Sequence, residues 1–166
     1  MILHDENKHL LDDALWVIVD PWTWNEPGTL HKSLKDNLEL HSIDINEYNY
    51  AFMDRLSVEL NDIQNKQHIV VHCPNPETHI IHKLFKNYKR FTNANDLYAN
   101  VHFDNIVICG FHYGICVNGL VERLMDINPM TKNIFVKRDL CCLMPYDTTY
   151  LKSRDEHIVN LGAKLI

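Results

Sequence analysis

Short apolar runs alternate with segments of helical periodicity along most of the chain. The first run covers residues 14–20 and shows no alternation of apolar and polar positions, which is typical of a strand buried on both faces of a parallel sheet. Similar runs cover residues 68–73, 105–111 and 133–137, and residues 163–166 are expected to form a short last strand. These runs are the predicted strands of the fold.

Segments with an apolar residue on every helical turn lie between the predicted strands. One begins after Asp44, which is a predicted N-cap with Glu47 as its capping-box partner, and continues to residue 63. The other predicted helices are a segment that starts at Asn75 and extends to Tyr88, a short turn over residues 95–98, a segment over residues 117–125 and a final helix over residues 155–162.

Strands that alternate with helices predict right-handed crossovers and a parallel sheet. The expected fold is therefore α/β, a Rossmann-like three-layer sandwich with a mostly parallel central sheet of about six strands and helices on both faces. No internal repeat or linker interrupts residues 1–166, so a single domain is predicted. Because ligands bind such sheets at the carboxyl ends of the strands, residues that follow strands are the candidates for a site.

Composition and charge exclude several classes of protein. Apolar residues make up 46% and charged residues 23% of 166 residues, which indicates a folded chain. A net charge of −6 opposes binding to nucleic acid or to an anionic membrane. No apolar run is long enough to span a bilayer, and no basic segment indicates a signal peptide. Five cysteines without a C-x-x-C pair argue against a disulfide framework and predict a cytoplasmic location.

Two residues placed after strands have chemistry that fits catalysis. Cys116 opens a predicted helix, where unpaired backbone N–H groups favour a thiolate and could stabilise an oxyanion. Asp20 ends the first strand and could accept the thiol proton. A lysine beside both residues would favour the ionised Asp20 carboxylate and the Cys116 thiolate. Each of these residues also has an alternative without a catalytic role. Cys116 could be a small buried apolar residue, and Asp20 could cap a loop or face a helix. The cations Lys83, Lys86, Lys89 and Arg90 could form the solvated face of a helix.

Residues 16–20, and residues 106–110 followed by Cys116 and Val117, resemble the isochorismatase-like cysteine hydrolases. In that family an Asp ends the first strand, a Cys-Val pair starts a helix after a strand that ends in Gly, and a Lys completes an Asp-Lys-Cys triad. The resemblance covers roughly residues 14–140 and implies a parallel six-stranded sheet between helices.

The resemblance implies a catalytic triad of Asp20, Lys86 and Cys116. The family lysine precedes a short Asp-Leu helix, and spacing from Asp96 selects Lys86, with Lys89 as the second choice. The family often has a Gln two positions after its first Asp, where this chain has Trp22.

The resemblance also locates the substrate. It implies a cis peptide bond between Phe111 and His112, and backbone N–H groups near Ile115 and Cys116 would hold the oxyanion. The predicted substrate-binding residues beside the cysteine are Phe111, His112 and Ile115. Trp22 is predicted to bind substrate as well, because Trp22 and Trp24 flank the end of the first strand and could wall an aromatic pocket; the alternative is that they only pack a loop against the sheet.

The predicted function is hydrolysis of a small molecule at an amide C–N or a vinyl-ether bond. The family implies no organic cofactor and frequent homo-oligomers, and no metal site is expected because His68 and His72 share one strand face while Cys73 takes the other. The alternative is a protein of the same fold that has lost catalysis and acts as a binding or interaction module. A flavodoxin-like nucleotide binder is disfavoured, because no glycine-rich loop follows the first strand.

Overall fold

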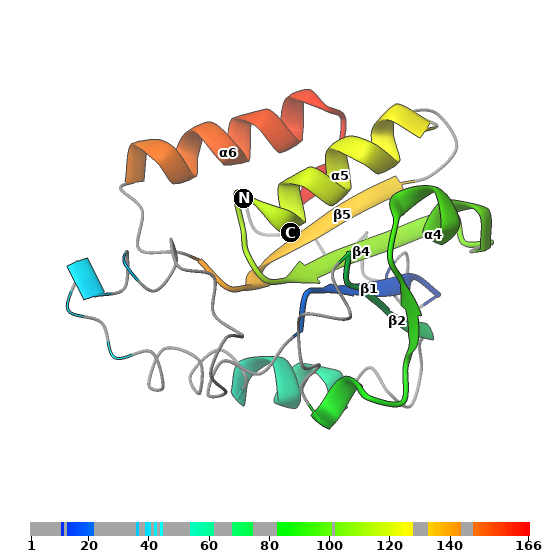
Figure 1. The fold of residues 1–166 in the computed structure, drawn as a ribbon. Coiled ribbons are helices and arrows are strands. Elements are labelled where there is room, and N and C mark those ends of the chain that lie inside the picture. Colours follow the sequence, from blue (N-terminus) through cyan, green and yellow to red (C-terminus); the bar gives the residue numbers. More distant parts are fainter. Residues whose placement is uncertain are drawn as a thin grey trace.

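The computed structural model describes a six-stranded sheet and the helices that cover it (Figure 1). The residues it describes are 11, 13–21, 36, 39–40, 42, 44, 54–61, 68–74, 83–100, 102–127, 133–143 and 148–166. Among the described helices, none is long and apolar enough to cross a membrane.

All strands of the sheet run parallel, in the order β3-β2-β1-β4-β5-β6. The α/β fold with a parallel six-stranded sheet, predicted from the alternating pattern, is therefore confirmed. The strands are β1 (Leu15–Val19), β2 (His68–His72), β3 (Lys89–Phe91), β4 (Asn105–Gly110), β5 (Asn133–Cys141) and β6 (Lys164–Leu165).

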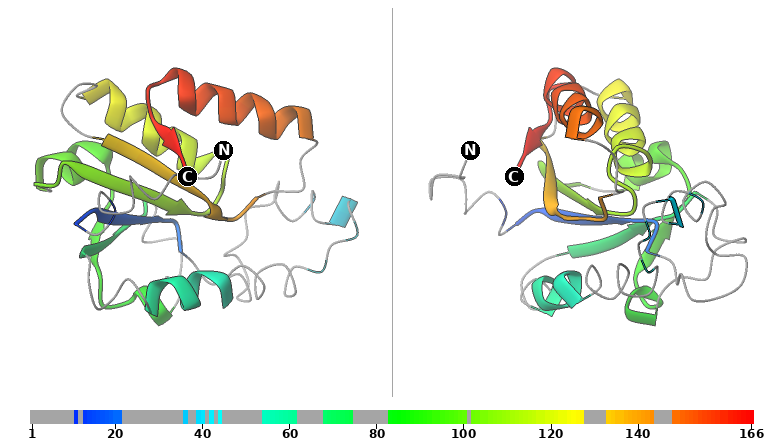
Figure 2. Two further views of the ribbon diagram at one scale, coloured as in Figure 1. Left: turned by 180° about the vertical axis from the view of Figure 1, so that it is seen from behind. Right: turned by 90° about the vertical axis from the view of Figure 1, so that its left-hand side faces the viewer.

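Helices cover both faces of the sheet (Figure 2). One face carries α5 (Cys116–Ile127) and α6 (Thr148–Asn160), and a helical segment over residues 54–61 lies on the opposite face. The shorter elements are η2 (Lys83–Phe85) and α4 (Ala94–Asn100), and α4 packs against α5.

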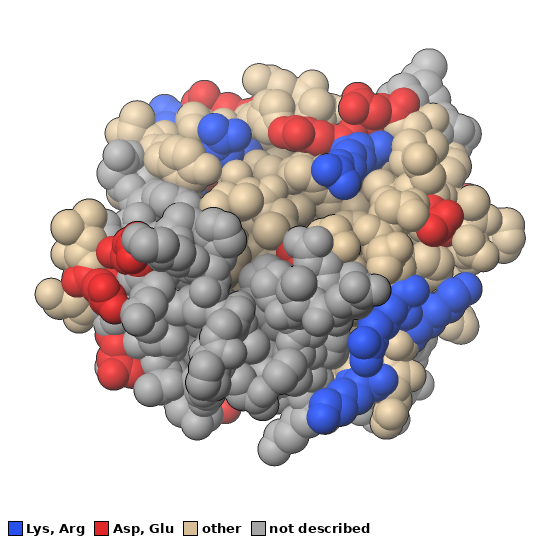
Figure 3. Space-filling view, in the orientation of Figure 1, with Lys and Arg blue, Asp and Glu red and all other residues tan. Residues whose placement is uncertain are grey.

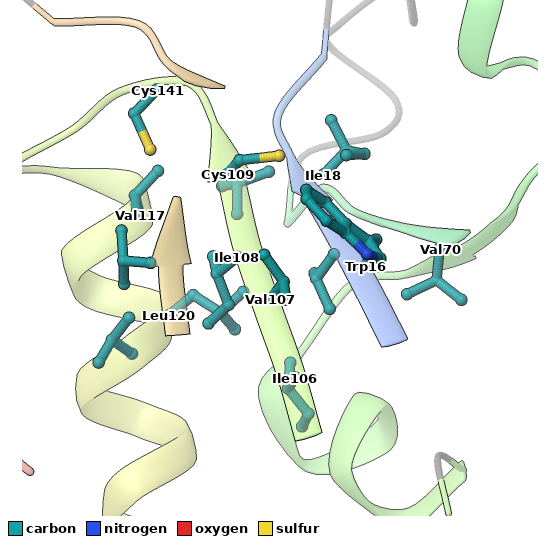
Figure 4. Close-up of a cluster of buried hydrophobic side chains, with 14 of the residues drawn as sticks. Trp16, Ile18, Val70, Ile106, Val107, Ile108, Cys109, Val117, Leu120 and Cys141 are labelled. Carbon is teal, nitrogen blue, oxygen red and sulfur yellow. The ribbon is translucent and has the colours of Figure 1, made fainter. Parts of the chain in front are cut away.

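The centre of the sheet is the hydrophobic core. Every residue of β1 is buried, which explains why its sequence is apolar without alternation. On α5, Val117 and Leu120 point toward β4, where Ile108 lies (Figure 4). Burying one such side chain contributes about 1.5–3 kcal/mol, so this contact fixes the position of α5 and of the cysteine at its first residue.

The register of the central strands aligns the carboxyl ends of β1, β2 and β4. Val19 pairs with His72 on one side and with Gly110 on the other. The residues that follow these three positions therefore emerge together at the carboxyl edge of the sheet. This edge is where ligands bind in parallel α/β sheets.

The structure corrects three predicted boundaries. The helix expected from Asn75 to Tyr88 lies outside the described residues up to position 82; in its described part only residues 83–85 are helical, as η2, and residues 89–91 form β3, which the sequence did not predict. β3 escaped prediction because only Phe91 of its three residues is buried. β5 continues past Lys137 to Cys141, and α6 starts at Thr148 rather than at residue 155. Of the helix expected after Asp44 and up to residue 63, residues 54–61 are described and are helical, and Asp44 itself is described outside a helix.

Candidate active site

Asp20 follows β1 and is held in an unusual backbone conformation. Its φ angle is 46°, in the left-handed region, which Asp tolerates better than most residues. Its backbone N–H donates to the His72 carbonyl at 2.9 Å, which anchors it to the neighbouring strand. Only 1% of the residue is exposed. The chain therefore leaves β1 in a conformation that keeps a carboxylate inside the protein.

Cys116 is the first residue of α5 and is partly buried. The loop before it carries the cis peptide bond between Phe111 and His112 that the family resemblance implied. A side-chain hydrogen bond joins the Cys116 thiol to the Asp20 carboxylate. The two residues expected to be nucleophile and base are thus in contact, although they are 96 positions apart in the sequence.

Both side chains line one cavity of about 190 Å³ at the carboxyl edge of the sheet. Asp20, His72 and Pro74 line it from the strand side. From the helix side it is lined by Ile115, Cys116, Gly119, Leu120 and Arg123. Its volume is below the usual 300–1,000 Å³ range for drug-sized ligands, so it fits a smaller molecule.

The environment of Asp20 makes it a stronger base than an ordinary carboxylate. Burial raises the pKa of Asp20 from 3.8 to about 6, and hydrogen bonds from the Cys116 and Cys73 thiols oppose this rise. At neutral pH the carboxylate is therefore mostly ionised. Its Oδ1 atom is buried and has no hydrogen-bond partner among the described residues.

The Cys116 thiol keeps its proton in the resting site. Burial, followed by the charge of Asp20 and the hydrogen bond to Asp20, raises the pKa of Cys116 to about 12, while a hydrogen bond from the His112 backbone to the sulfur lowers it. The expectation that the helix terminus would favour a thiolate is therefore wrong for the resting protein. Nucleophilic attack by the sulfur requires transfer of its proton, and Asp20 is in place to accept it.

His72 ends β2 and faces the same cavity. It is 4% exposed, and neither ring nitrogen has a hydrogen-bond partner among the described residues. Burial, together with the charge of Arg123, lowers the pKa of His72 to about 4. The imidazole is consequently neutral at physiological pH, with one nitrogen that donates and one that accepts.

The predicted catalytic lysine does not line this cavity. Lys86 is exposed in the turn that follows η2, because the helical segment ends at Phe85. Lys89 is exposed at the amino end of β3, with its Nζ 4.8 Å from the centre of the Phe91 ring. Figure 3 shows Lys and Arg side chains gathered at the lower right of the molecule in that view. Among the described residues, the cation that lines the cavity is Arg123.

The predicted substrate-binding residues have different positions. Ile115 lines the cavity and is 48% exposed. Phe111 is buried in the core and packs edge-on against the His112 ring at 5.7 Å, and neither side chain is part of the cavity lining. Trp22 lies outside the described residues.

Sequence reasoning missed Arg123 as a site residue, although its spacing offered a signal. Three cavity-lining residues of α5 follow Cys116 at helical spacing: Gly119 three positions later, Leu120 four and Arg123 seven. This spacing places all of them on the same face of α5 as Cys116. For His72 the signal was its position at the end of a predicted strand, as for Asp20. Within the described part of the chain, no group of three or more His, Cys, Asp or Glu side chains could hold a metal ion.

The sequence matches no known family model and no curated protein. Similar solved structures nevertheless cover nearly the whole chain. An isochorismatase-like hydrolase from Alkaliphilus metalliredigens has a TM-score of 0.58 at 8% identity, over 93% of this chain and 94% of that one.

Two YcaC proteins are similar as well. YcaC from Pseudomonas aeruginosa, with hexane-2,5-diol and covalent acrylamide, has a TM-score of 0.53 at 13% identity, over 95% of this chain and 76% of that one. YcaC from Escherichia coli, an octameric hydrolase of unknown specificity, has a TM-score of 0.52 at 14% identity, over 100% of this chain and 78% of that one. The resemblance found in the sequence is confirmed in the fold: the chain has the isochorismatase-like hydrolase fold.

Proposed function

We propose that this chain, which has the isochorismatase-like hydrolase fold, hydrolyses an amide C–N bond of a small molecule with Cys116 as nucleophile and Asp20 as general base. The observation that carries the proposal is the hydrogen bond between the two side chains at the wall of one cavity. A nucleophile in contact with its base is the arrangement required for covalent catalysis.

In the first half of the reaction, Asp20 accepts the thiol proton while the Cys116 sulfur attacks the carbonyl carbon. The carbonyl oxygen becomes an oxyanion, and the Cys116 backbone N–H, which donates to no described residue, is available to it. The Ile115 N–H is engaged with the His112 carbonyl at 3.1 Å. The C–N bond then breaks, Asp20 gives its proton to the leaving amine, and a thioester remains on Cys116.

In the second half, Asp20 accepts a proton from water as the water oxygen attacks the thioester carbon. The C–S bond breaks, the carboxylic acid product leaves, and the proton held by Asp20 returns to the sulfur. A carboxyl group with a pKa near 6 suits both directions of proton transfer, because its affinity for protons is close to the working pH. Lys86 has no part in this scheme, since its side chain lies outside the cavity.

A small activated ester tests the proposal directly. With p-nitrophenyl acetate, the wild-type protein is expected to release nitrophenol in a burst and to carry an acetyl group on Cys116, located by peptide mass spectrometry. Cys116→Ala removes the nucleophile and should abolish the burst and the adduct. Cys109→Ala is the matched control, because Cys109 is buried in the core and does not line the cavity. A burst that survives in Cys116→Ala would refute the cysteine mechanism. Absence of both the burst and the Cys116 adduct in the wild type would favour the binding protein considered as the alternative.

The pH dependence of turnover should report Asp20. Since burial raises the pKa of Asp20 to about 6, kcat/KM for any hydrolysed amide should fall as the pH decreases through about 6, where the base becomes protonated. The raised pKa of Cys116 predicts no gain in rate from thiolate formation below about pH 9. A rate that is flat down to pH 5 would show that Asp20 is not the base.

The raised pKa of Asp20 also favours a second reaction. A carboxyl group near pKa 6 is partly protonated at neutral pH and could protonate a vinyl ether, the other bond type predicted for this family. In that reaction Cys116→Ala should retain turnover while Asp20→Asn loses it. The two variants thus separate the two reactions.

The proposal includes a homo-oligomer in the cytoplasm. The E. coli YcaC structure is described as octameric, and all five cysteines of this chain are free thiols, which suits a reducing compartment. Light scattering would measure the oligomeric state, and a monomer at micromolar concentration would contradict this part of the proposal.

A further inference from the structure

The cavity has a reactive end and a cationic end. Asp20 and Cys116 are in contact at one end, while Arg123 is two helical turns farther along α5. Seven residues of helix correspond to a rise of about 10 Å between the two Cα atoms. Pro74, Ile115 and Leu120 supply apolar lining. The cavity can therefore hold a small molecule with a reactive carbonyl at one end and an anion at the other.

Among the described residues, Arg123 is the cation that lines the cavity. It forms no ion pair with a described residue, although it also lines a second, more open cavity of about 350 Å³ that includes Asp126. Arg123 is exposed, so an unpaired charge is tolerated there. His72 and Arg123 line the same cavity, and the charge of Arg123 lowers the pKa of His72.

His72 supplies an independent indication of a ligand-binding site. The His72 imidazole is buried, and its two nitrogens have no hydrogen-bond partner among the described residues. This arrangement is costly, because buried polar groups in native proteins are almost always hydrogen-bonded. Its position on the cavity wall, near Arg123, means that a bound molecule can satisfy it. The two residues together offer a charged donor and a neutral donor.

We propose that the substrate carries a carboxylate, which the Arg123 guanidinium binds with a hydrogen bond from His72, a few bonds away from the carbonyl that Cys116 attacks. This inference rests on the proposed function and names its substrate class. A guanidinium binds a carboxylate with two parallel hydrogen bonds, which adds orientation to affinity. Asp20 repels a carboxylate from the reactive end, so the substrate is held in one direction.

Two reagents that differ in one charge test the proposal. Iodoacetylglycine and iodoacetylglycinamide carry the same reactive carbon, and only the first ends in a carboxylate. In the wild type, Cys116 should be alkylated about tenfold faster by the anionic reagent, as expected for a charge-assisted hydrogen bond. Arg123→Gln should abolish this preference, and Arg123→Lys should restore part of it. Rates are measured on Cys116 by peptide mass spectrometry.

Arg90→Gln is the matched control, because Arg90 is an exposed arginine on β3 that does not line the cavity. It should keep the preference for the anionic reagent. Equal rates for the two reagents in the wild type, or the same rate ratio in wild type and Arg123→Gln, would overturn the carboxylate assignment while Cys116 remains a reactive nucleophile.

A binding measurement separates this inference from the proposed function. N-acetylglycine should raise the melting temperature of the wild type and not that of Arg123→Gln, whereas N-acetylglycinamide should have no effect on either. If this pattern holds while Cys116 forms no acetyl adduct, the anion site stands and the hydrolase proposal fails. A larger shift with inorganic phosphate, or a shift that survives in Arg123→Gln, would refute the carboxylate site.

Discussion

Asp20→Asn is expected to stop turnover and, at neutral pH, to make the folded protein more stable. Burial raises the pKa of Asp20 from 3.8 to about 6, so the Asp20 carboxylate binds its proton more tightly in the folded protein than in the unfolded chain. At pH 7 the ionised carboxylate therefore costs up to about 3 kcal/mol, since each tenfold change in proton affinity corresponds to about 1.4 kcal/mol. Asn has nearly the same shape and no charge, so this cost disappears.

The gain in stability should depend on pH with a definite sign. Because the folded-state pKa is raised, Asp20 stabilises the fold only below its unfolded pKa, and this contribution is lost as the pH rises through about 6. The difference in unfolding free energy between Asp20→Asn and wild type should thus be largest at about pH 7 and above, and should approach zero near pH 4.

Turnover should change in the opposite direction. Without a base beside it, the Cys116 thiol keeps its proton, and loss of a general base typically lowers the rate by about 10²–10⁴-fold. Urea unfolding at pH 7.5 and pH 4.5, together with kcat/KM, measures both effects. Asp104→Asn, at an exposed carboxylate, is the control and should change neither. An Asp20→Asn variant less stable than wild type at pH 7.5 would show that Asp20 has a structural role instead of a catalytic one.

The strands at the centre of the fold were predictable because each is covered on both faces. β1, β2 and β4 read as continuous apolar runs, and no surface helix gives such a pattern. The edge of the sheet was not predictable, since β3 has three residues and two of them are exposed cations. Helical spacing of Leu84 and Phe85 with Tyr88 suggested a helix there, but sheet pairing with β2 overrides that local pattern.

The same limit explains which site residues the sequence revealed. Asp20 and Cys116 follow central strands, and sheet register alone brings such residues together. The lysine was assigned by spacing across the edge of the sheet, where the boundaries were wrong, and its side chain is outside the cavity. The protonation state of Cys116 was also mispredicted, because burial and the charge of Asp20 outweigh the helix terminus.

Gly110→Ala is expected to destabilise the protein by more than about 3 kcal/mol, because backbone strain and a steric clash act together. Gly110 ends β4 with a φ angle of 116°, a conformation that alanine rarely adopts. A Cβ atom there would lie 2.4 Å from the Val19 carbonyl oxygen and 2.7 Å from the Val19 nitrogen. Both are backbone atoms of β1, so no side-chain rotation can relieve the clash.

The position of Gly110 links this strain to the site. Relief would require β1 and β4 to separate at Val19, which breaks the hydrogen bond of 2.9 Å from the Phe111 N–H to the Val19 carbonyl. Asp20 follows Val19, and the loop to Cys116 follows Gly110, so separation would also part the base from the nucleophile.

Gly119→Ala is the matched control for this prediction. A Cβ at Gly119 meets no atom within 4 Å, and the residue lies inside α5. Replacing a helical glycine with alanine stabilises by about 0.5–1 kcal/mol, so the two substitutions should shift the urea midpoint in opposite directions. If Gly110→Ala unfolded at the wild-type midpoint, the close approach of β1 and β4 would not be what holds Asp20 against Cys116.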